Sequence, residues 1–443
     1  MIPFPKDFET NVLNDSFLDD TLLEALNSSA PISIRLNSKK TRPNLEMSEK
    51  IHWCDNGYYL DKRPVFTLDP LFHAGCYYPQ EAGSMVLDYI IRQLDLPHEP
   101  KILDLCAAPG GKSTLVANFL ADRGLLVANE LMHNRALVLK ENLTKWGSSN
   151  VVVTNNKPSD FKQLPQFFDV VIADVPCSGE GMFRKDPESR NEWSQKNLEM
   201  CVLRQQQIIG DVWNTISPDG YLIYSTCTLN EKENERNILW IASEFDAEIV
   251  HIEVQETFLK GRNGIGNYAI PGKTKSEGFF IAVIKKTASS KQNLKKTSFN
   301  EWKNIKDFTS INNLCKIENQ SFFQWKDYIL SFPLGSLDNI SQILSSKLYV
   351  LKAGTTVASV IGKKLIPSEE LALNPLLRYA EESIELSLEQ SLQYLKGETF
   401  NLTSHKGFFL LNYMGEPLGW INHLGNRFNN LYPKDWRIRM KIN

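Results

Sequence analysis

Two cysteines stand where a parallel sheet would bring them together. Asp174-Val-Pro-Cys177 follows one predicted strand, and Tyr224-Ser-Thr-Cys227 follows the next strand along the chain. Because the carboxyl ends of parallel strands meet at one edge of a sheet, both thiols are expected to converge on one cleft. A lone free cysteine is usually a packing residue. This pair, flanked by Ser, Thr and Gly, instead favours nucleophilic thiolate chemistry.

A glycine-containing loop follows an earlier apolar segment, Lys101 to Leu105. It reads Cys106-Ala-Ala-Pro-Gly-Gly-Lys112 and leads into an apolar helix. Glycines at such a turn let the backbone approach a nucleotide-like ligand closely. The phosphate-binding pattern G-x-x-x-x-G-K-[ST] fails because residue 106 is Cys, and G-x-G-x-x-G is absent. The loop therefore favours a cofactor other than a phosphate-bound nucleotide, although a plain strand-to-helix turn is the alternative for any single pair of glycines.

Glu130 ends the next predicted strand, where a carboxylate can accept hydrogen bonds from both ribose hydroxyls of a nucleoside. Arg135, on the following helix, is placed to lie beside that carboxylate. Each residue taken alone also fits a solvated surface. Their position next to the glycine loop is what favours a cofactor site.

These residues must be positioned by alternating strands and helices, a pattern that predicts a doubly wound α/β sheet. The predicted strands cover residues 101–105, 125–129, 151–154, 169–173 and 220–225. The predicted helices cover residues 80–94, 134–146, 199–216 and 231–244. A late strand at residues 278–284 is expected to close one edge of the sheet.

Two smaller units are expected on either side of this core, since 443 residues exceed what one hydrophobic core usually holds. A helix at 15–26 and a strand at 33–37 predict a small N-terminal α/β unit. Lys286 to Thr297 carries no apolar period and predicts a linker. Short apolar segments separated by Gly, ending in the basic tail Trp436 to Lys441, predict a β-rich module. The expected domains are residues 1–72, 73–290 and 295–443.

Composition narrows the class of protein. A hydrophobic fraction of 42% and a charged fraction of 23% are typical of a globular chain. No stretch approaches the roughly 18 apolar residues of a membrane span, and the N-terminus has no apolar core, so a cytoplasmic protein without membrane contact is expected.

The seven cysteines form no C-x-x-C pair, so no metal site is expected. The net charge of −3 argues against indiscriminate coating of nucleic acid, while the basic surplus after residue 290 fits phosphate contact or a solvated surface.

The motifs together resemble those of the Sun/Nop family of RNA cytosine-5 methyltransferases, and within it the RsmF-like branch of bacterial 16S ribosomal RNA enzymes. The resemblance is carried by Asp104 to Thr114, Asp174 to Pro187 with Trp193, Tyr224 to Asn234, Arg35-Leu-Asn37 and Tyr78 to Ala82. It spans residues 30–290. The segment Gly419 to Pro433 is similar, more loosely, to the C-terminal PUA-like RNA-binding module of that branch.

The resemblance implies a Rossmann-like core that uses S-adenosyl-L-methionine to methylate carbon 5 of a cytosine in RNA. Carbon 5 is a poor nucleophile until a thiolate adds to carbon 6 and creates an enamine. By resemblance, Cys227 is that nucleophile and Cys177 helps expel the enzyme from the methylated product. Asp174 would hydrogen-bond the base near the charged end of the cofactor, and Lys112 would orient the base or the loop. The implied cofactor-binding residues are Cys106, Ala107, Ala108, Pro109, Gly110, Gly111, Lys112, Glu130, Arg135 and Asp174.

One departure from the family pattern concerns the adenine of the cofactor. The third motif usually offers an Asp there, whereas this chain has Lys157, so Asp160 or the backbone near Pro158 is the alternative contact.

The expected partner is small-subunit ribosomal RNA or the small ribosomal subunit, with transfer RNA as the alternative. A DNA cytosine-5 methyltransferase, with Cys177 as nucleophile, is a second reading, and the complete Cys227 motif speaks against it. A non-catalytic RNA-binding ribosome-assembly protein is a third, and both intact cysteines and the cofactor loop speak against that.

Overall fold

A ten-stranded sheet forms the centre of the computed structural model, in the order β11-β12-β13-β9-β8-β5-β6-β7-β17 with β10 also paired to β13. The structure describes residues 2–254, 257–287, 299–305, 309–312, 314–316, 318–377 and 383–440. The parallel strands are β5 (Lys101–Asp104), β6 (Leu125–Asn129), β7 (Val151–Thr154), β8 (Phe168–Asp174) and β9 (Ile216–Thr226). The antiparallel strands are β10 (Ala247–Val250), β11 (Leu259–Lys260), β12 (Asn267–Ala269), β13 (Phe279–Lys286) and β17 (Val350–Ala353).

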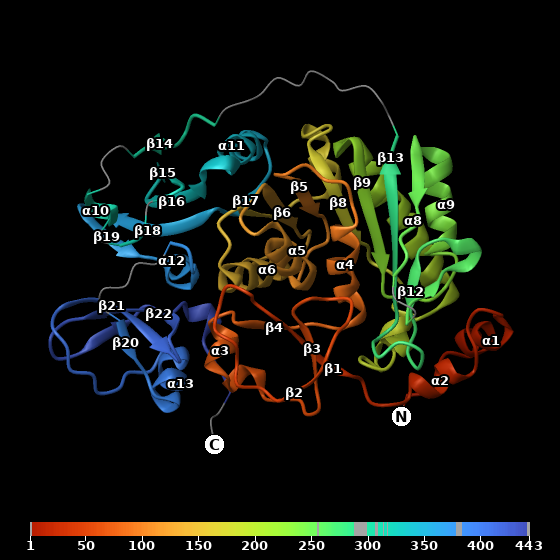
Figure 1. The fold of residues 1–443 in the computed structure, drawn as a ribbon, viewed down its shortest axis with the longest axis horizontal. Helices are drawn as coiled ribbons and strands as arrows, with labels where there is room; N and C mark the ends of the chain where they lie inside the picture. The colour runs from red at the N-terminus through yellow and green to blue at the C-terminus, as the bar shows by residue number, and fades with distance from the viewer. Residues whose placement is uncertain are drawn as a thin grey trace.

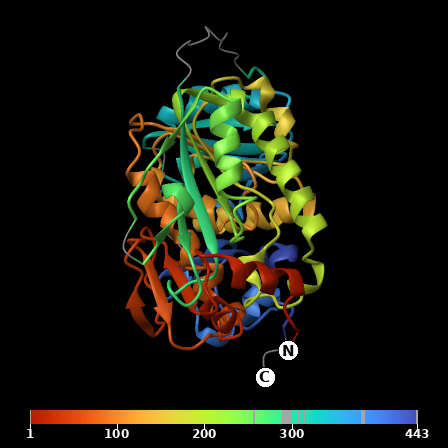
Figure 2. The same cartoon turned by 90° about the vertical axis from the view of Figure 1, so that its right-hand side faces the viewer.

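Helices cover both faces of this sheet, with α8 and α9 on one side and α4 on the other (Figures 1 and 2). The longer helices are α4 (Val86–Arg92), α5 (Gly111–Leu120), α6 (His133–Trp146), α8 (Gln195–Val212) and α9 (Glu235–Glu244). Short turns are η2 (Gly83–Met85), η3 (Pro158–Gln163), η4 (Glu180–Met182), α7 (Ser189–Glu192), η5 (Trp213–Thr215) and η6 (Arg262–Gly264). The predicted doubly wound α/β class is confirmed.

Side chains alternate between the two faces of the sheet along the parallel strands, and both faces are buried, which explains the near-continuous apolar sequences of these strands. Leu103, Val127 and Val171 pack into one hydrophobic cluster, and Ile102 and Leu126 pack into another on the opposite face. All five side chains are fully buried. The sheet is therefore held by apolar contacts on both faces, and its polar side chains are concentrated where strands end.

The prediction that residues 278–284 close the sheet is wrong. Both β10 and β12 pair along the outer side of β13, with Val250 opposite Val283 and Ala269 opposite Phe279. These added strands are three and four residues long, too short to give an alternating apolar signal.

The other edge of the sheet is completed from the C-terminal part of the chain. Strand β17 pairs antiparallel with β7, Ala353 lying opposite Val152. Next to it, the side-chain amide of Asn156 accepts from the N–H of Tyr349 at 3.0 Å and donates to its carbonyl at 3.1 Å. A domain starting at residue 295 would thus contain one strand of the core sheet. Residues 288–297 of the predicted linker lie outside the described residues.

The N-terminal unit is a four-stranded sheet in the order β2-β3-β1-β4. Its elements are α1 (Lys6–Asn14), α2 (Thr21–Ala25), β1 (Ile32–Leu36), β2 (Met47–Lys50), β3 (Gly57–Leu60), η1 (Phe66–Leu68), α3 (Pro70–His73) and β4 (Tyr77–Pro79). The predicted helix at 15–26 is shorter than expected and follows an unforeseen helix α1. Buried Arg35 ties this unit to the core, because its guanidinium donates to Gln80 Oε1 at 2.8 Å and to Thr114 Oγ1 at 2.5 Å.

The C-terminal part is rich in strands, as predicted. One sheet contains β14 (Lys303–Asn304), β15 (Gln320–Trp325), β16 (Tyr328–Pro333), β18 (Thr355–Ile361) and β19 (Lys364–Pro367). The other contains β20 (Ser383–Glu385), β21 (Gly407–Tyr413), β22 (Glu416–His423) and β23 (Phe428–Asn430). Helices α10 (Thr309–Asn312), η7 (Leu334–Ser336), α11 (Leu337–Ser345), α12 (Glu369–Leu373), α13 (Leu388–Lys396) and η8 (Lys434–Trp436) join them.

The two ends of the chain share one hydrophobic cluster. Ile34 and Leu71 of the N-terminal unit pack with Leu395 and Ile421 of the C-terminal part, and α3 lies beside β22 in Figure 1. The N-terminal sheet and the last C-terminal sheet therefore form one continuous body alongside the core.

Two glycines touch backbone to backbone next to the second cysteine motif. The N–H of Gly278 donates to the carbonyl of Gly181 at 3.0 Å, and the N–H of Gly181 donates to the carbonyl of Cys227 at 2.9 Å. A Cβ atom on Gly278 would lie 2.5 Å from the Cα of Gly181. No side chain fits there unless the backbone moves.

Gly278→Ala is expected to destabilise the protein by about 1–3 kcal/mol, because the added methyl group overpacks a backbone contact. Gly210→Ala is the matched control: Gly210 lies in α8 with open space around it, so a methyl group there should raise stability by up to about 1 kcal/mol through helix propensity. Urea denaturation midpoints measure both effects. Equal midpoints for Gly278→Ala and wild type would show that the glycine contact imposes no constraint.

Candidate active site

The register of β8 and β9 brings the two cysteines into contact. Asp174 lies opposite Ser225 at the carboxyl ends of these parallel strands, and Cys177 and Cys227 follow in the next loops. Their Sγ atoms lie 3.2 Å apart, and the N–H of Cys227 donates to the Sγ of Cys177 at 3.3 Å. Both are free thiols, partly accessible to solvent. The convergence expected from the strand order is present.

Cys227 influences the protonation of Cys177. The hydrogen bond with Cys227, followed by burial, raises the pKa of the Cys177 thiol well above its ordinary value. One negative charge on the pair disfavours a second at this distance. A reaction that takes one sulfur into a covalent bond would remove that obstacle for the other.

Glu233 ties together the two loops that carry the cysteines. Its buried carboxylate accepts from the N–H of Ser178 at 3.0 Å, from Gln205 Nε2 at 2.7 Å and from Asn230 Nδ2 at 2.8 Å. The hydroxyls of Ser178 and Thr228 are 2.9 Å apart and join the loops directly. Sequence reasoning gave Glu233 no role, although an acidic residue among Ser, Thr and Asn is the pattern of a loop anchor.

Asp174 is held on both sides. Ser225 Oγ donates to its Oδ1 at 2.7 Å, and Lys112 Nζ donates to its Oδ2 at 2.8 Å. Burial lowers the pKa of the Lys112 ammonium, but the Asp174 carboxylate outweighs burial and leaves that pKa above its ordinary value. The Lys112 charge also lies 5.0 Å from the Phe279 ring. Lys112 thus fixes Asp174 beside the thiols.

A cavity opens where the glycine loop meets β4 and β8. It is lined by Tyr78, Pro79, Gln80, Glu81, Ser84, Asp104, Cys106, Ala107, Ala108, Pro109, Gly111, Lys112, Asp174 and Lys185. Gly110 has φ +116°, a conformation that side chains disfavour, so glycine is needed there. The N–H of Ala107 donates to the carbonyl of Asn129 at 2.8 Å and fixes the loop. Burial raises the pKa of the Cys106 thiol, which makes it a poor nucleophile.

Asp104 has an unsatisfied oxygen in this cavity wall. Its Oδ2 accepts from Ser113 Oγ at 2.6 Å, whereas its buried Oδ1 has no hydrogen-bond partner. Burial raises the pKa of the carboxyl to about 7. An unpaired buried oxygen is costly, and it fits a ligand that brings a hydrogen-bond donor or a positive charge. Sequence reasoning did not single out Asp104 within its motif.

Glu130 and Arg135 stand at the other side of the glycine loop. Glu130 is buried, and its Oε1 accepts from the N–H of Met132 at 2.9 Å. Arg135 Nη1 lies 3.6 Å from Glu130 Oε2, and its Nη2 donates to the carbonyl of Ala108 at 2.8 Å. Exposed Leu131 and Met132 follow Glu130. A carboxylate beside apolar side chains suits a nucleoside, with hydroxyls on one side and a flat ring on the other.

The residues considered for the adenine have other contacts. Asp160 Oδ2 accepts from the N–H of Lys157 at 3.0 Å and so caps η3, which begins at Pro158. Asp160 is absent from the cavity wall described above. Leu131 and Met132 are also absent from that wall, so Asp160 or the backbone near Pro158 stays a prediction for the adenine contact.

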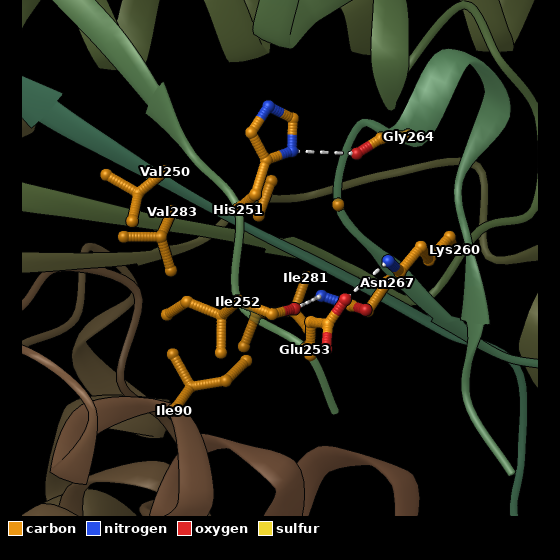
Figure 3. Close-up of a pocket in the computed structure, with 12 residues that line it drawn as sticks. Ile90, Val250, His251, Ile252, Glu253, Lys260, Gly264, Asn267, Ile281 and Val283 are labelled. Carbon is orange, nitrogen blue, oxygen red and sulfur yellow. Dashed lines mark hydrogen bonds and ion pairs between the residues drawn. The ribbon is translucent and has the colours of Figure 1, made fainter. Parts of the chain in front are cut away.

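A separate cavity at the outer side of β13 contains none of the predicted site residues (Figure 3). Its polar groups satisfy one another: His251 Nδ1 lies 3.1 Å from the carbonyl of Gly264, and Lys260 Nζ lies 2.9 Å from Glu253 Oε1. Asn267 Nδ2 donates to the carbonyl of Ile252 at 3.1 Å. No cysteine is among the described residues that line this space, which sets it apart from the cysteine site.

The described residues contain neither a candidate metal site nor a candidate membrane-spanning helix. Within them, no group of three or more His, Cys, Asp or Glu side chains is arranged to hold a metal ion. None of the helices in that same part of the chain is long and apolar enough to cross a membrane.

Known proteins match this chain along most of its length. Residues 91–285 match the family model of the 16S rRNA methyltransferase RsmB/F, residues 381–438 the methyltransferase RsmF PUA domain, and residues 4–82 the N-terminal domain of 16S rRNA methyltransferase RsmF. Ribosomal RNA small subunit methyltransferase F of Shewanella loihica is 31% identical over 424 residues, which covers 89% of this chain and 84% of that protein. Its namesake in Salmonella arizonae is 28% identical, covering 91% and 89%.

Two solved structures have a fold similar to that of this chain. A methyltransferase homolog protein from Pyrococcus horikoshii has a TM-score of 0.52 and 26% identity, covering 60% of this chain and 89% of that one. NSun6 from the same organism has a TM-score of 0.54 and 20% identity, covering 65% and 100%.

A doubly wound sheet with this glycine loop and cavity, together with the family match, defines an S-adenosylmethionine-dependent methyltransferase. The cavity fits the cofactor, since Asp104 in its wall has an unpaired buried oxygen that a cationic group can satisfy. Within that class, the chain belongs to the ribosomal RNA small subunit methyltransferase F family.

Affinity for S-adenosylmethionine is expected to depend on pH through Asp104. The cationic cofactor should bind the ionised carboxylate, which is the minor form below its pKa of about 7. Affinity should therefore rise about tenfold between about pH 6 and about pH 8 and then level off. Asp104→Asn should bind weakly and without this dependence. Isothermal titration calorimetry measures each affinity.

Glu180→Gln is the matched control for Asp104→Asn. Burial also raises the pKa of Glu180 to about 7, but Glu180 does not line the cofactor cavity. This variant should keep the pH dependence of the wild type. If Asp104→Asn keeps it too, another group binds the cationic part of the cofactor.

Proposed function

We propose that this protein transfers a methyl group from S-adenosylmethionine to carbon 5 of a cytosine in small-subunit ribosomal RNA, through a covalent bond to Cys227. The observation that carries the proposal is the contact of Cys177 and Cys227, 3.2 Å between sulfurs, at strand ends next to Asp174. A methyltransferase acting on oxygen or nitrogen needs no thiol nucleophile. Methylation of carbon 5 of a pyrimidine does need one, because a thiolate must first activate that carbon.

The reaction begins when the Cys227 thiolate adds to carbon 6 of the cytosine. The S–C bond forms, and the electron pair of the C5=C6 bond shifts into the ring, where N3 takes a proton. Asp174 hydrogen-bonds the Watson–Crick edge and holds that proton, in the orientation set by Lys112 and Ser225. The base must first leave its stack to reach the thiols. Bound S-adenosylmethionine supplies an electrophilic methyl group, which the activated carbon 5 attacks.

The second half of the reaction releases the enzyme. The C5 proton leaves and its electron pair re-forms the C5=C6 bond. The bond from carbon 6 to Cys227 Sγ breaks with its electron pair staying on the sulfur, and N3 gives back the proton that it took. Contact with Cys227 is the largest cause of the high pKa of Cys177. Once Cys227 is a thioether, it no longer donates a proton or carries charge, so the pKa of Cys177 falls. Cys177 thereby becomes able to take the C5 proton at the stage when a base is needed.

We further propose three functional domains, residues 1–72, 73–290 and 295–443, the first and third binding RNA. The match of residues 381–438 to a PUA domain and the hydrophobic cluster that joins it to the N-terminal unit support one shared RNA surface. The names of the curated relatives support small-subunit ribosomal RNA as the substrate.

The two cysteines should respond differently to substitution. Cys227→Ala should lose methylation and adduct formation, because no nucleophile remains for carbon 6. Cys177→Ala should still attack and methylate but release product slowly, so a protein–RNA adduct should accumulate in the presence of cofactor. Denaturing gel electrophoresis with radiolabelled RNA detects that adduct, and bisulfite sequencing locates the methylated cytosine. Cys315→Ala, a buried cysteine of the C-terminal part, is the control.

The competing assignment, Cys177 as nucleophile, predicts the adduct in Cys227→Ala instead. If both variants methylate at the wild-type rate and trap nothing, the thiols are packing residues and the covalent mechanism is wrong. Equal activity on single-stranded DNA of the same sequence would contradict RNA as the substrate.

A further inference from the structure

A third cavity borders Cys177, one of the two thiols of the cysteine site. Cys177, Ser178 and Gly179 form one wall, and helix α8 forms the other through Asn197, Met200, Cys201 and Arg204. Met182, Asp186, Ser189, Glu192 and Trp193 complete it. None of the residues assigned to cofactor binding lines this space, and Cys177 is the one proposed catalytic residue in its wall.

The wall contributed by α8 is one face of the helix. Residues 197, 200, 201 and 204 are spaced i, i+3, i+4, i+7 and therefore point the same way. The protein-facing side of α8 consists of other residues, Leu198, Gln205, Ile209 and Val212, which are buried. The cavity side is left open, and the Met200 side chain is 50% exposed.

The chemistry of this wall combines an apolar surface with a cation. Arg204 is exposed and forms no ion pair with any residue that the structure describes. Met200 presents a polarisable thioether, which contacts flat aromatic rings favourably. The carboxylates of Asp186 and Glu192 also line the cavity. They would repel a cluster of phosphates but can accept hydrogen bonds from the amino groups of a base. One base with one phosphate fits this combination better than a multiply charged anion.

We propose that this cavity binds the nucleotide adjacent to the target cytosine in the same RNA strand. Its base lies against Met200, and its phosphate lies at Arg204. This inference rests on the proposed function, because a cytosine on Cys227 brings the neighbouring nucleotide to the wall that begins at Cys177. The cavity then holds the strand while its target base is out of the stack.

Kinetics of the full-length protein test this assignment, with small ribosomal subunits from a strain that lacks this enzyme as the RNA probe. Met200→Ala should raise KM for the subunits at least about fivefold and leave kcat nearly unchanged, because the lost contact is to bound RNA and not to the reacting atoms. Arg204→Ala should raise KM and reduce the slope of log KM against log salt by about 1, the loss of one phosphate contact. Affinity for S-adenosylmethionine should stay at the wild-type value in both.

Lys196→Ala and Leu203→Ala are the matched controls. Lys196 and Leu203 are exposed on α8 but do not line the cavity, so these variants should keep the wild-type KM and salt slope. If Met200→Ala and Arg204→Ala match the controls while the wild type forms 5-methylcytosine, the cavity does not hold RNA and the inference is overturned. If the wild type forms no 5-methylcytosine in RNA, the proposed function itself fails. A fall in kcat with unchanged KM would also overturn the inference, since it would place the cavity in the chemical step.

Discussion

The parallel pairing of β8 with β9 is the constraint on which the rest of the site depends. One register, Asp174 opposite Ser225, determines that a carboxylate receives a hydroxyl hydrogen bond at 2.7 Å and that two sulfurs two and three residues later lie 3.2 Å apart. A one-residue slip would turn every side chain of β9 to the other face of the sheet. Because both faces are buried against apolar clusters, such a slip would cost the hydrophobic burial of the whole strand.

Several buried charged side chains lie around that pairing, and they differ in how completely hydrogen bonds and ion pairs satisfy them. Glu233 is satisfied by three donors, one from each of two loops and one from α8, so it holds those loops together. Lys112 and Asp174 satisfy each other. Asp104 is satisfied at one oxygen alone, and burial accordingly raises its pKa. In the low dielectric of the interior, a fully satisfied hydrogen-bond network is rigid, whereas an unpaired polar atom is costly. A ligand that supplies the missing partner removes that cost.

The sequence was sufficient to predict the parts of the fold with long apolar periods. Strands 125–129 and 151–154 were predicted to the residue, and the order of strands was enough to bring Cys177 and Cys227 together. The added strands β10, β11 and β12 have two to four residues each and give no such signal. Strand β17 was missed for another reason: its partner β7 lies about two hundred residues away in the chain, and pairing at that separation leaves no local pattern. Glu233 and Asp104 were missed because their roles depend on which donors surround them, which tertiary packing alone decides.

Strand β17 fixes the distance between the C-terminal part of the chain and the core sheet. It is hydrogen-bonded to β7. Next to it, two hydrogen bonds join the backbone of Tyr349 to the side-chain amide of Asn156. Asn156 in turn donates its N–H to Asn129, the residue before Glu130. The C-terminal part therefore cannot swing on a hinge relative to the cofactor side without breaking the edge of the central sheet. If the C-terminal part binds a folded RNA as proposed, the thiols lie at a fixed distance from that contact. The shape of the RNA over this distance, more than the bases near the target, would then select the base that reaches them.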